Sequence, residues 1–259
     1  MTSHSDTMAT MSRRVRLPGG IAISRLRAYE PPAPDGQSGG AAHIHLACEE
    51  LYYVTGGEGA VELISAKDGF VHVPLSSGSV LQHAPGVLHR LINYEDFEVL
   101  VVMQNAGLPE PGDTIFTFPD ADLADASRYA GLALATDKVA ALQRRDLTVE
   151  GFNAIRHAFE RSHDEGTRAL RAFYDRAVRL AGDSVNEWDA CVDAGPVAAN
   201  TATQERLSAI RSGDGEYLTD GTLTSFSVAT AESDYEPGIC GMRWPISSHA
   251  VEHLAASGS

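Results

Sequence analysis

Apolar positions in the first half of the chain recur in short runs that alternate with polar residues. Ile21, Ile23 and Leu26 predict a first strand, and residues 31–40 form a loop by their Pro and Gly content. Residues 41–105 consist of short apolar segments with turn signals between them: "ELYYVTGG", "GAVELIS", "FVHVPL", "SSGSVLQHAPG", "LHRLINY" and "FEVLVVMQN". Short strands at such close spacing predict an antiparallel barrel or sandwich.

The second half of the chain changes to a helical period of 3.6 residues. Apolar residues between positions 152 and 159 share one helical face behind a cap at Thr148, and those from Leu170 to Val178 share another. We expect two antiparallel helices here and a third over residues 201–212. A Thr-rich, β-like stretch is expected over residues 216–230.

These patterns predict a mainly β fold with four parts. We expect a disordered leader (1–12), a β domain that is a barrel or sandwich (13–118) and a flexible tail (248–259). Between the last two lies a mainly helical extension (119–247) that packs on the β domain, forms a lid over it or pairs subunits. The late segment "SDYEPGICGMRWPIS" adds a short β-like element and is a candidate lid over the barrel mouth.

Composition limits the kinds of binding partner and the cellular compartment that we expect for this chain. The net charge of −15 argues against nucleic acid and anionic membranes. No apolar run approaches the ~20 residues that span a bilayer, and the first 14 residues lack the order of a signal peptide, so we expect a cytoplasmic protein. The three cysteines form no CxxC pair, which predicts reduced and mostly buried thiols. Open barrel edges favour a homodimer.

The candidate metal-binding residues are concentrated in the stretch "HIHLACEELYYVTGGEG". His43 and His45 lie two residues apart, so on a strand both imidazoles point to one face. A turn or bulge in "LACE" is needed before Glu50 can join them, whereas Glu49 has the right parity in a continuous strand; geometry leaves both glutamates open. His89 opens a later strand that can return antiparallel to the first. Three imidazoles and one carboxylate suit Fe(II), Mn(II), Ni(II), Cu(II) or Zn(II), with coordination positions left open.

The two stretches resemble the paired motifs of the cupin superfamily, G-x5-HxH-x(3,4)-E-x6-G and G-x5-PxG-x2-H-x3-N. His43, His45, Glu50 and Gly57 match the first motif, while Gly78, Gly86, His89 and Asn93 match the second. Two positions depart from the pattern: Ala84 stands where the second motif has its proline, and Ser38 where the first has its leading glycine.

The resemblance covers residues 20–106. It implies a double-stranded β-helix, or jelly-roll-like, barrel that holds a metal in its mouth, and it favours Glu50 over Glu49 as the carboxylate ligand.

Three functions follow from this ligand set. The first is a non-haem Fe(II) dioxygenase acting on a small organic substrate, in which Glu50 is a metal ligand and a candidate base. The second is an oxygen-independent isomerase, lyase or decarboxylase that uses the metal as a Lewis acid. The third is a non-catalytic barrel that binds a small ligand.

The remaining candidates lie near these ligands in the sequence. Tyr52, Met103, Gln104 and Cys48 can line a substrate pocket, although ordinary core packing explains each of them as well. We expect His72 and His83 to be exposed strand residues and Arg90 to point outward. No site is expected at the other histidines of the second half of the chain, which are His157, His163, His249 and His253.

Overall fold

The computed structural model describes residues 17–106, 108, 113–223 and 235–246, and the expected leader and tail lie outside these ranges. Its strands, in chain order, are β1 (Ala22–Ala28), β2 (His43–His45), β3 (Glu50–Ser65), β4 (Gly69–Ser76), β5 (Val80–His83), β6 (Leu88–Met103), β7 (Thr114–Phe116), β8 (Glu236–Pro237) and β9 (Gly241–Pro245). Its α-helices are α1 (Asp120–Leu123), α2 (Ala126–Ala133), α3 (Lys138–Arg161), α4 (His163–Ala181), α5 (Val185–Val192) and α6 (Ala198–Ser212). The fold is therefore a large antiparallel sheet with helices, as predicted.

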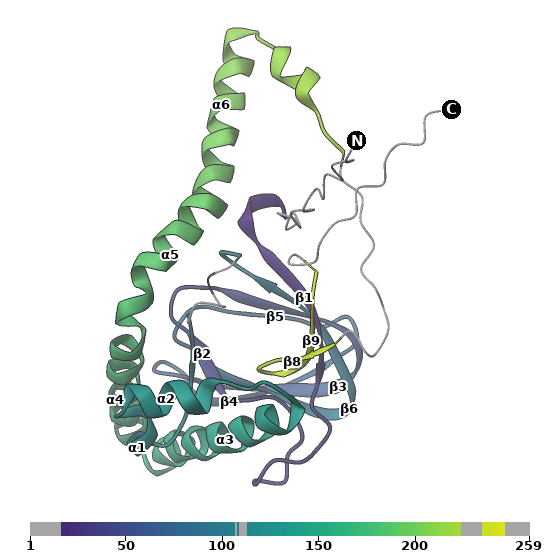
Figure 1. Cartoon of the computed structure of the whole chain (residues 1–259). Helices are drawn as coiled ribbons and strands as arrows, with labels where there is room; N and C mark the ends of the chain where they lie inside the picture. The colour runs from purple at the N-terminus through teal and green to yellow at the C-terminus, as the bar shows by residue number, and fades with distance from the viewer. Residues whose placement is uncertain (1–16, 107, 109–112, 224–234, 247–259) are drawn as a thin grey trace, which may run out of the picture.

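Two long strands organise the sheet. β3 and β6 pair along most of their length, and each joins two segments that the sequence suggested were separate strands. The first half of β3 also pairs with β5, and its second half pairs with β4. The early half of β6 pairs with β2 and its late half with β1, so two layers are continuous through β3 and β6 (Figure 1). Among the described strands the pairing does not close into a complete ring.

The bend between the two layers lies at a bulge around Gly57. The β3–β6 register shifts three times between Val54 and Gly59, which turns both strands. Gly57 has φ +72°, and a Cβ there would lie 2.2 Å from two carbonyl oxygens, those of Glu95 and Asp96. Only glycine fits this close approach, which explains why the motif has a glycine here.

The predicted break before Glu50 is confirmed. β2 ends at His45 and β3 begins at Glu50, so residues 46–49 form the connection that lets the two strands turn towards one another. Glu49 lies on this connection and is exposed, with its carboxylate accepting a hydrogen bond from Gln82 at 2.7 Å. Glu50 is 4% exposed.

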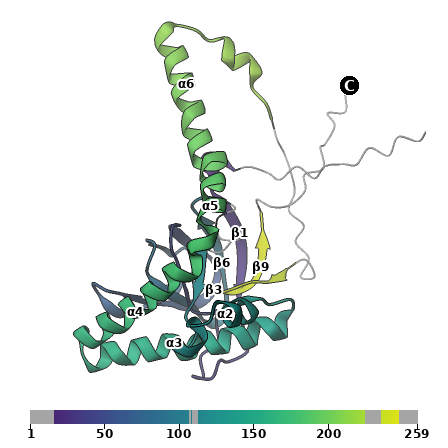
Figure 2. The same cartoon turned by 60° about the vertical axis from the view of Figure 1, so that its left-hand side comes forward.

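Helices α3 and α4 run in opposite directions on the two sides of a sharp turn (Figure 2), and both contact β4. The predicted cap at Thr148 is wrong: α3 begins ten residues earlier, and the Asp137 side chain accepts a hydrogen bond from Ala140 N as its N-cap. Thr148 is fully buried in mid-helix, where its hydroxyl donates to Arg145 O and accepts from Ala42 N. Thr148 therefore joins α3 to the chain just before β2.

The third predicted helix is confirmed as α6, which follows α5 through a π-helical turn (Asp193–Val197) and projects away from the sheet (Figure 1). The β-like expectation for residues 216–230 is wrong at its start. Glu216–Asp220 form a 3-10 helix, with Asp214 accepting a hydrogen bond from Glu216 N. Residues 224–230 lie outside the described part. None of the described helices is long and apolar enough to cross a membrane.

The C-terminal strands return to the sheet. β9 pairs antiparallel with β1, and β8 pairs with β9 to form a short hairpin. The tip of this hairpin reaches the start of β2, where Ala41 N donates to Ile239 O at 3.0 Å. The segment suggested as a lid therefore adds an edge to the sheet and lies beside the histidine strand (Figure 1).

Candidate metal centre

The three motif histidines converge inside the sheet. His43 on β2 lies directly opposite His89 on β6, and His45 shares the face of His43 because it is two residues away. Their ring centroids are 4.1 Å apart for His43–His89 and 5.2 Å for His43–His45. Each histidine is at most 3% exposed.

Glu50 supplies the carboxylate of the cluster. Its Oε2 lies 3.0 Å from His89 Nε2 and 3.4 Å from His45 Nε2. One donor atom from each of the four residues lies within 4.8 Å of the other three. The structure thus brings together His43, His45, Glu50 and His89, and it places Glu49 outside the group.

The far side of each imidazole is held in place. His43 Nδ1 lies 3.0 Å from Ala41 O, and His89 Nδ1 lies 2.9 Å from Val87 O, so each donates to a backbone carbonyl. His45 Nδ1 lies 3.1 Å from a carboxylate oxygen of Asp113. These bonds fix the Nδ1–H tautomer, which leaves the Nε2 lone pairs directed at the centre of the cluster.

Asp113 is a functional candidate that the sequence did not reveal. It is fully buried, and its second oxygen accepts hydrogen bonds from Leu46 N and Ala47 N at 2.9 and 2.6 Å. It therefore fixes His45 and the connection before Glu50 at once. It lies 68 residues beyond His45, and only its position just before β7, the strand paired with β2, brings it into contact.

Charge is shared unevenly within the cluster. Burial lowers the pKa of His45, but the hydrogen bond with Asp113 and the negative charge of Glu50 outweigh it and raise that pKa to about 9. Burial lowers the pKa of His89 to about 4, helped by the nearby imidazoles. Burial raises the pKa of Glu50, but the surrounding histidines outweigh this and hold it well below its usual range. A divalent cation needs the ionised carboxylate, and on binding it would displace the proton that His45 holds.

Two buried atoms of the cluster have no hydrogen-bond partner, Glu50 Oε2 and His89 Nε2. The neighbouring ring nitrogens are close to them but are not aligned as donors. Buried polar atoms without partners are costly unless something else binds them. Three Nε2 atoms and one carboxylate oxygen around a common point fit one divalent transition metal ion, which would satisfy these atoms.

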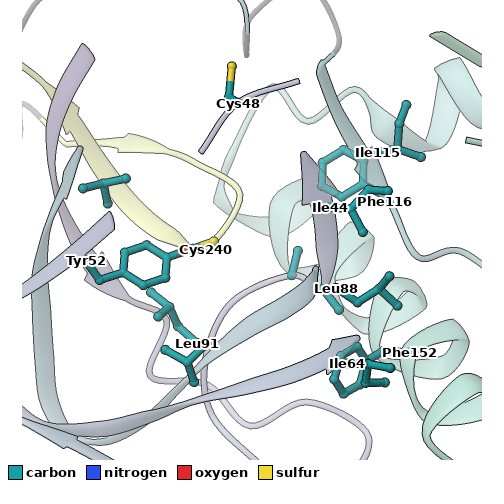
Figure 3. Packing of buried hydrophobic residues seen from close by; sticks show 14 of the residues in the cluster. Ile44, Cys48, Tyr52, Ile64, Leu88, Leu91, Ile115, Phe116, Phe152 and Cys240 are labelled. Carbon is teal, nitrogen blue, oxygen red and sulfur yellow. The ribbon is translucent and has the colours of Figure 1, made fainter. Parts of the chain in front are cut away.

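The predicted pocket residues divide into two groups. Met103 is buried and lines the cavity, while Tyr52 is fully buried with its ring 5.9 Å from that of His83. Gln104 is exposed and binds Glu49 N at the rim, so it does not line the cavity. Cys48 is buried but points away from Tyr52 (Figure 3), and its Sγ accepts a hydrogen bond from Asn105 Nδ2. Tyr52 and Met103 thus lie nearer the cluster than the other two.

His83 was expected to be exposed, and this is wrong. It ends β5 directly opposite Glu50 and is 7% exposed. Its Nε2 lies 3.3 Å from Glu50 Oε2, and neither of its ring nitrogens has a hydrogen-bond partner. The even spacing from Leu81 was the available signal, because Leu81 is itself partly buried against the core. His72 is exposed, as expected, and His157 and His163 are exposed as well.

A cavity of about 590 Å³ opens onto the cluster. Its walls are mostly apolar side chains from β1, β7, α2 and the β8–β9 hairpin, among them Phe116 and Tyr129. Arg144 of α3 contributes a charge: it is 8% exposed and donates to Ala133 O and to Gly238 O. No carboxylate of the described residues forms an ion pair with Arg144, and its Nε has no partner.

The hairpin also brings a thiol to the cluster. Cys240 is 4% exposed, and its Sγ lies 4.0 Å from His43 Nε2. Figure 3 shows the Cys240 sulfur beside the Tyr52 ring. The residue lies 197 positions after His43 in the sequence, so no local pattern connects the two. Cys48, Cys191 and Cys240 form no disulfide, as predicted.

Comparison with known proteins finds only partial similarity to solved structures. No family model matches the sequence, and no curated protein does. Among solved structures, a predicted oxalate decarboxylase from Thermotoga maritima is 28% identical, with 32% of this chain and 66% of that chain covered and a TM-score of 0.26. An oxalate oxidase is 20% identical over 32% of this chain and 40% of that one (TM-score 0.27), and the coconut allergen cocosin is 18% identical over 32% and 21% (TM-score 0.28). These are cupin proteins, and the match to them is partial, spanning at most 66% of their length.

Proposed function

We propose that this chain is a metal-dependent cupin enzyme that acts on a small organic anion. The observation that carries the proposal is the cluster of His43, His45, Glu50 and His89. Glu50 Oε2 and His89 Nε2 are buried there without hydrogen-bond partners, while the Nδ1 of each histidine is anchored. A site meant only for packing would have its buried polar atoms paired. The cavity beside the cluster provides room for a substrate.

The lining of the cavity supports the substrate class. Its walls are mostly apolar, so they favour a compact hydrophobic body. Arg144 adds a buried guanidinium with no carboxylate partner among the described residues. Desolvation of that charge lowers the pKa of Arg144, and an anionic ligand would offset the same cost. We infer a small carboxylate, or a similar anion, attached to an apolar body.

We favour a dioxygenase reaction with Fe(II). When bound, the metal activates dioxygen and the substrate at its open positions. The chain's own residues hold the three imidazoles rigid through Ala41 O, Val87 O and Asp113, and the apolar walls exclude water. Both oxygen atoms enter the substrate in such a reaction, so no separate reductant is needed.

One observation favours the oxygen-independent alternative. His83 Nε2 lies 3.3 Å from Glu50 Oε2, just beyond the range of about 2.6–3.2 Å for proton transfer, and such contacts commonly shorten when substrate binds. Isomerases, lyases and decarboxylases all need such a proton transfer next to a polarised carbonyl. In this reading Glu50 takes a substrate proton and His83 accepts or returns it.

The test is a metal analysis followed by paired activity screens. Protein purified without chelator should hold close to one transition metal ion per chain. Oxygen uptake by Fe-loaded protein with diketones, catechols, thiols and enols supports the dioxygenase, whereas turnover without oxygen supports the alternative. A metal-free protein with intact ligands would falsify both, and metal with ligand binding but no turnover would leave a binding protein.

A separate experiment tests the anion. Hexanoate and benzoate should raise the melting temperature of metal-loaded protein, whereas the matched amides hexanamide and benzamide should not. The difference should disappear in Arg144→Gln and persist in Arg144→Lys, which keeps the charge. Equal effects of acids and amides on the wild type would contradict the substrate class while leaving the metal centre intact. The homodimer stays a prediction, to be checked by the mass of the protein in solution.

A further inference from the structure

The C-terminal hairpin places a thiol at the edge of the metal cluster. Cys240 Sγ lies 4.0 Å from His43 Nε2, the ring nitrogen that faces the other ligands. Typical metal–nitrogen and metal–sulfur bonds sum to about 4.4 Å, so one ion can contact both atoms. The four motif donors all lie within 4.8 Å of one another, and Cys240 stands just outside this group, next to His43.

The backbone around Cys240 is packed so closely that only glycine fits at its neighbours. A Cβ on Gly40 would lie 2.6 Å from Cys240 Cα, and one on Gly241 would lie 2.1 Å from Arg27 O. A Cβ on Gly238 would lie 2.9 Å from Gly241 O. These approaches place the hairpin tip deeper than any side chain at those three positions would allow.

Further hydrogen bonds hold the tip in this position. Gly238 O accepts from Tyr29 Oη at 2.9 Å and from Arg144 Nη2 at 2.7 Å. The position of Cys240 therefore results from fixed contacts on both sides of it, and its thiol lies in the cavity wall with His43, His45 and Glu50.

A second observation points to a ligand at the same place. Glu50 Oε2 and His89 Nε2 are buried without hydrogen-bond partners, and so is the Tyr52 hydroxyl beside Cys240 (Figure 3). Several polar groups without partners around one thiol indicate that the group which satisfies them is an ion or a molecule bound there.

We propose that Cys240 is a fifth protein ligand of the metal, supplied by the C-terminal hairpin. The thiol loses its proton to solvent as the metal–sulfur bond forms. A thiolate in the donor set shifts preference towards softer ions such as Fe(II), Zn(II) and Cu and away from Mn(II) and Mg(II). It also ties the hairpin to the ion, so metal binding and closure of this cavity wall become linked. This inference rests on the proposed metal centre.

X-ray absorption on zinc-loaded, reduced wild-type protein tests the proposal without any variant. We expect one sulfur scatterer at about 2.3 Å in addition to nitrogen and oxygen at about 2.0–2.1 Å. Zinc bound by nitrogen and oxygen alone would overturn the role of Cys240 and leave the proposed function standing. Failure to bind zinc or any other transition metal would overturn both.

Variants identify the cysteine and test the link to the hairpin. Cys240→Ser should lose the sulfur scatterer and still bind zinc through the four motif residues, while the control Cys191→Ser should keep it. Hydrogen exchange in residues 236–245 should slow on zinc binding in the wild type and in Cys191→Ser, and should not slow in Cys240→Ser. A sulfur scatterer that persists in Cys240→Ser would assign the sulfur to another cysteine or to Met103 and overturn the proposal. Should Cys240→Ser fail to fold, the wild-type spectrum together with Cys48→Ser and Cys191→Ser decides the assignment by elimination.

Discussion

Two clusters of buried charged side chains lie on opposite faces of the β3–β6 pair. Leu63 lies opposite His89, and the next pair along the strands, Glu62 and Arg90, points to the other side. There Arg90 Nε donates to Glu62 at 2.7 Å and Arg90 Nη2 to Asp35 at 2.6 Å. Arg90 was expected to point outward, and it does lie on the side opposite His89, but helix α3 covers that face and leaves it 1% exposed.

The difference between the clusters lies in their unpaired atoms. In the Arg90 cluster each buried charge meets an opposite charge, and neither Arg90 nor Glu62 has a fully buried side-chain atom without a partner. In the metal cluster the inward atoms of Glu50, His83 and His89 have none. The two clusters are equally buried but differ in what they can do: the first attaches α3 to the sheet, and the second has atoms available to bind a cation.

The largest expected effect is loss of the metal in His89→Ala. Removing one of four ligands should lower metal affinity by more than about a hundredfold. This exceeds the loss of about 10- to 100-fold that is typical when a residue hydrogen-bonded to a ligand is mutated. The metal content after dialysis should fall from near one ion per chain to near zero, and added metal should no longer raise the melting temperature. The control is His72→Ala, which removes an exposed histidine on β4. Equal metal content in both variants would contradict the assignment of His89.

The Arg90 cluster should respond in stability and not in metal content. Arg90→Ala leaves Glu62 buried without its closest cation, so we expect a loss of about 3–5 kcal/mol in the free energy of unfolding. Urea unfolding of metal-free protein measures this change. The double variant Glu62→Leu with Arg90→Met removes both charges and should recover most of the loss. If Arg90→Ala costs under about 1 kcal/mol, the pair is as weak as an exposed ion pair.

A smaller effect is expected for Asp113→Asn. The amide keeps the shape of the side chain but holds His45 Nδ1–H less strongly, so metal affinity should fall about 10- to 100-fold, or about 1.4–2.8 kcal/mol. Competition with a coloured chelator measures the affinity. Thr114→Val is the matched control, because the Thr114 hydroxyl also approaches His45 Nδ1, at 3.3 Å, but carries no charge. If Thr114→Val lowers the metal affinity more than Asp113→Asn does, Asp113 does not have the role proposed for it.

The sequence predicted the parts of the molecule that depend on local spacing. The parity of His43 and His45, the break before Glu50 and the period of α4 and α6 all follow from neighbours along the chain. The bulge at Gly57 was not predicted as one, because the apolar alternation on its two sides suggested two strands where β3 is continuous.

The remaining parts depend on contacts between distant segments. Asp113 and Cys240 reach the site through strand pairing and a hairpin, 68 and 197 residues away from the histidines they approach. The burial of Arg90 depends on α3, and alternation within β6 carries no information about what covers its outer face. His83 was misjudged for a related reason: its strand has four residues, too few to show which face is buried.

The smallest expected effect is a pH dependence at Asp35, the exposed edge of the Arg90 cluster. Burial raises the pKa of Asp35, but the charge and hydrogen bond of Arg90 outweigh it, so the pKa lies below its ordinary value of 3.8. A carboxyl with a lowered folded pKa adds stability that is fully present above its unfolded pKa and is lost as the pH falls through the folded value. Wild type should therefore be more stable than Asp35→Asn by a constant amount above about pH 5, and the difference should shrink at lower pH. Urea unfolding of both proteins across this range measures it, and a difference that grows on acidification would show that Asp35 is not stabilised by Arg90.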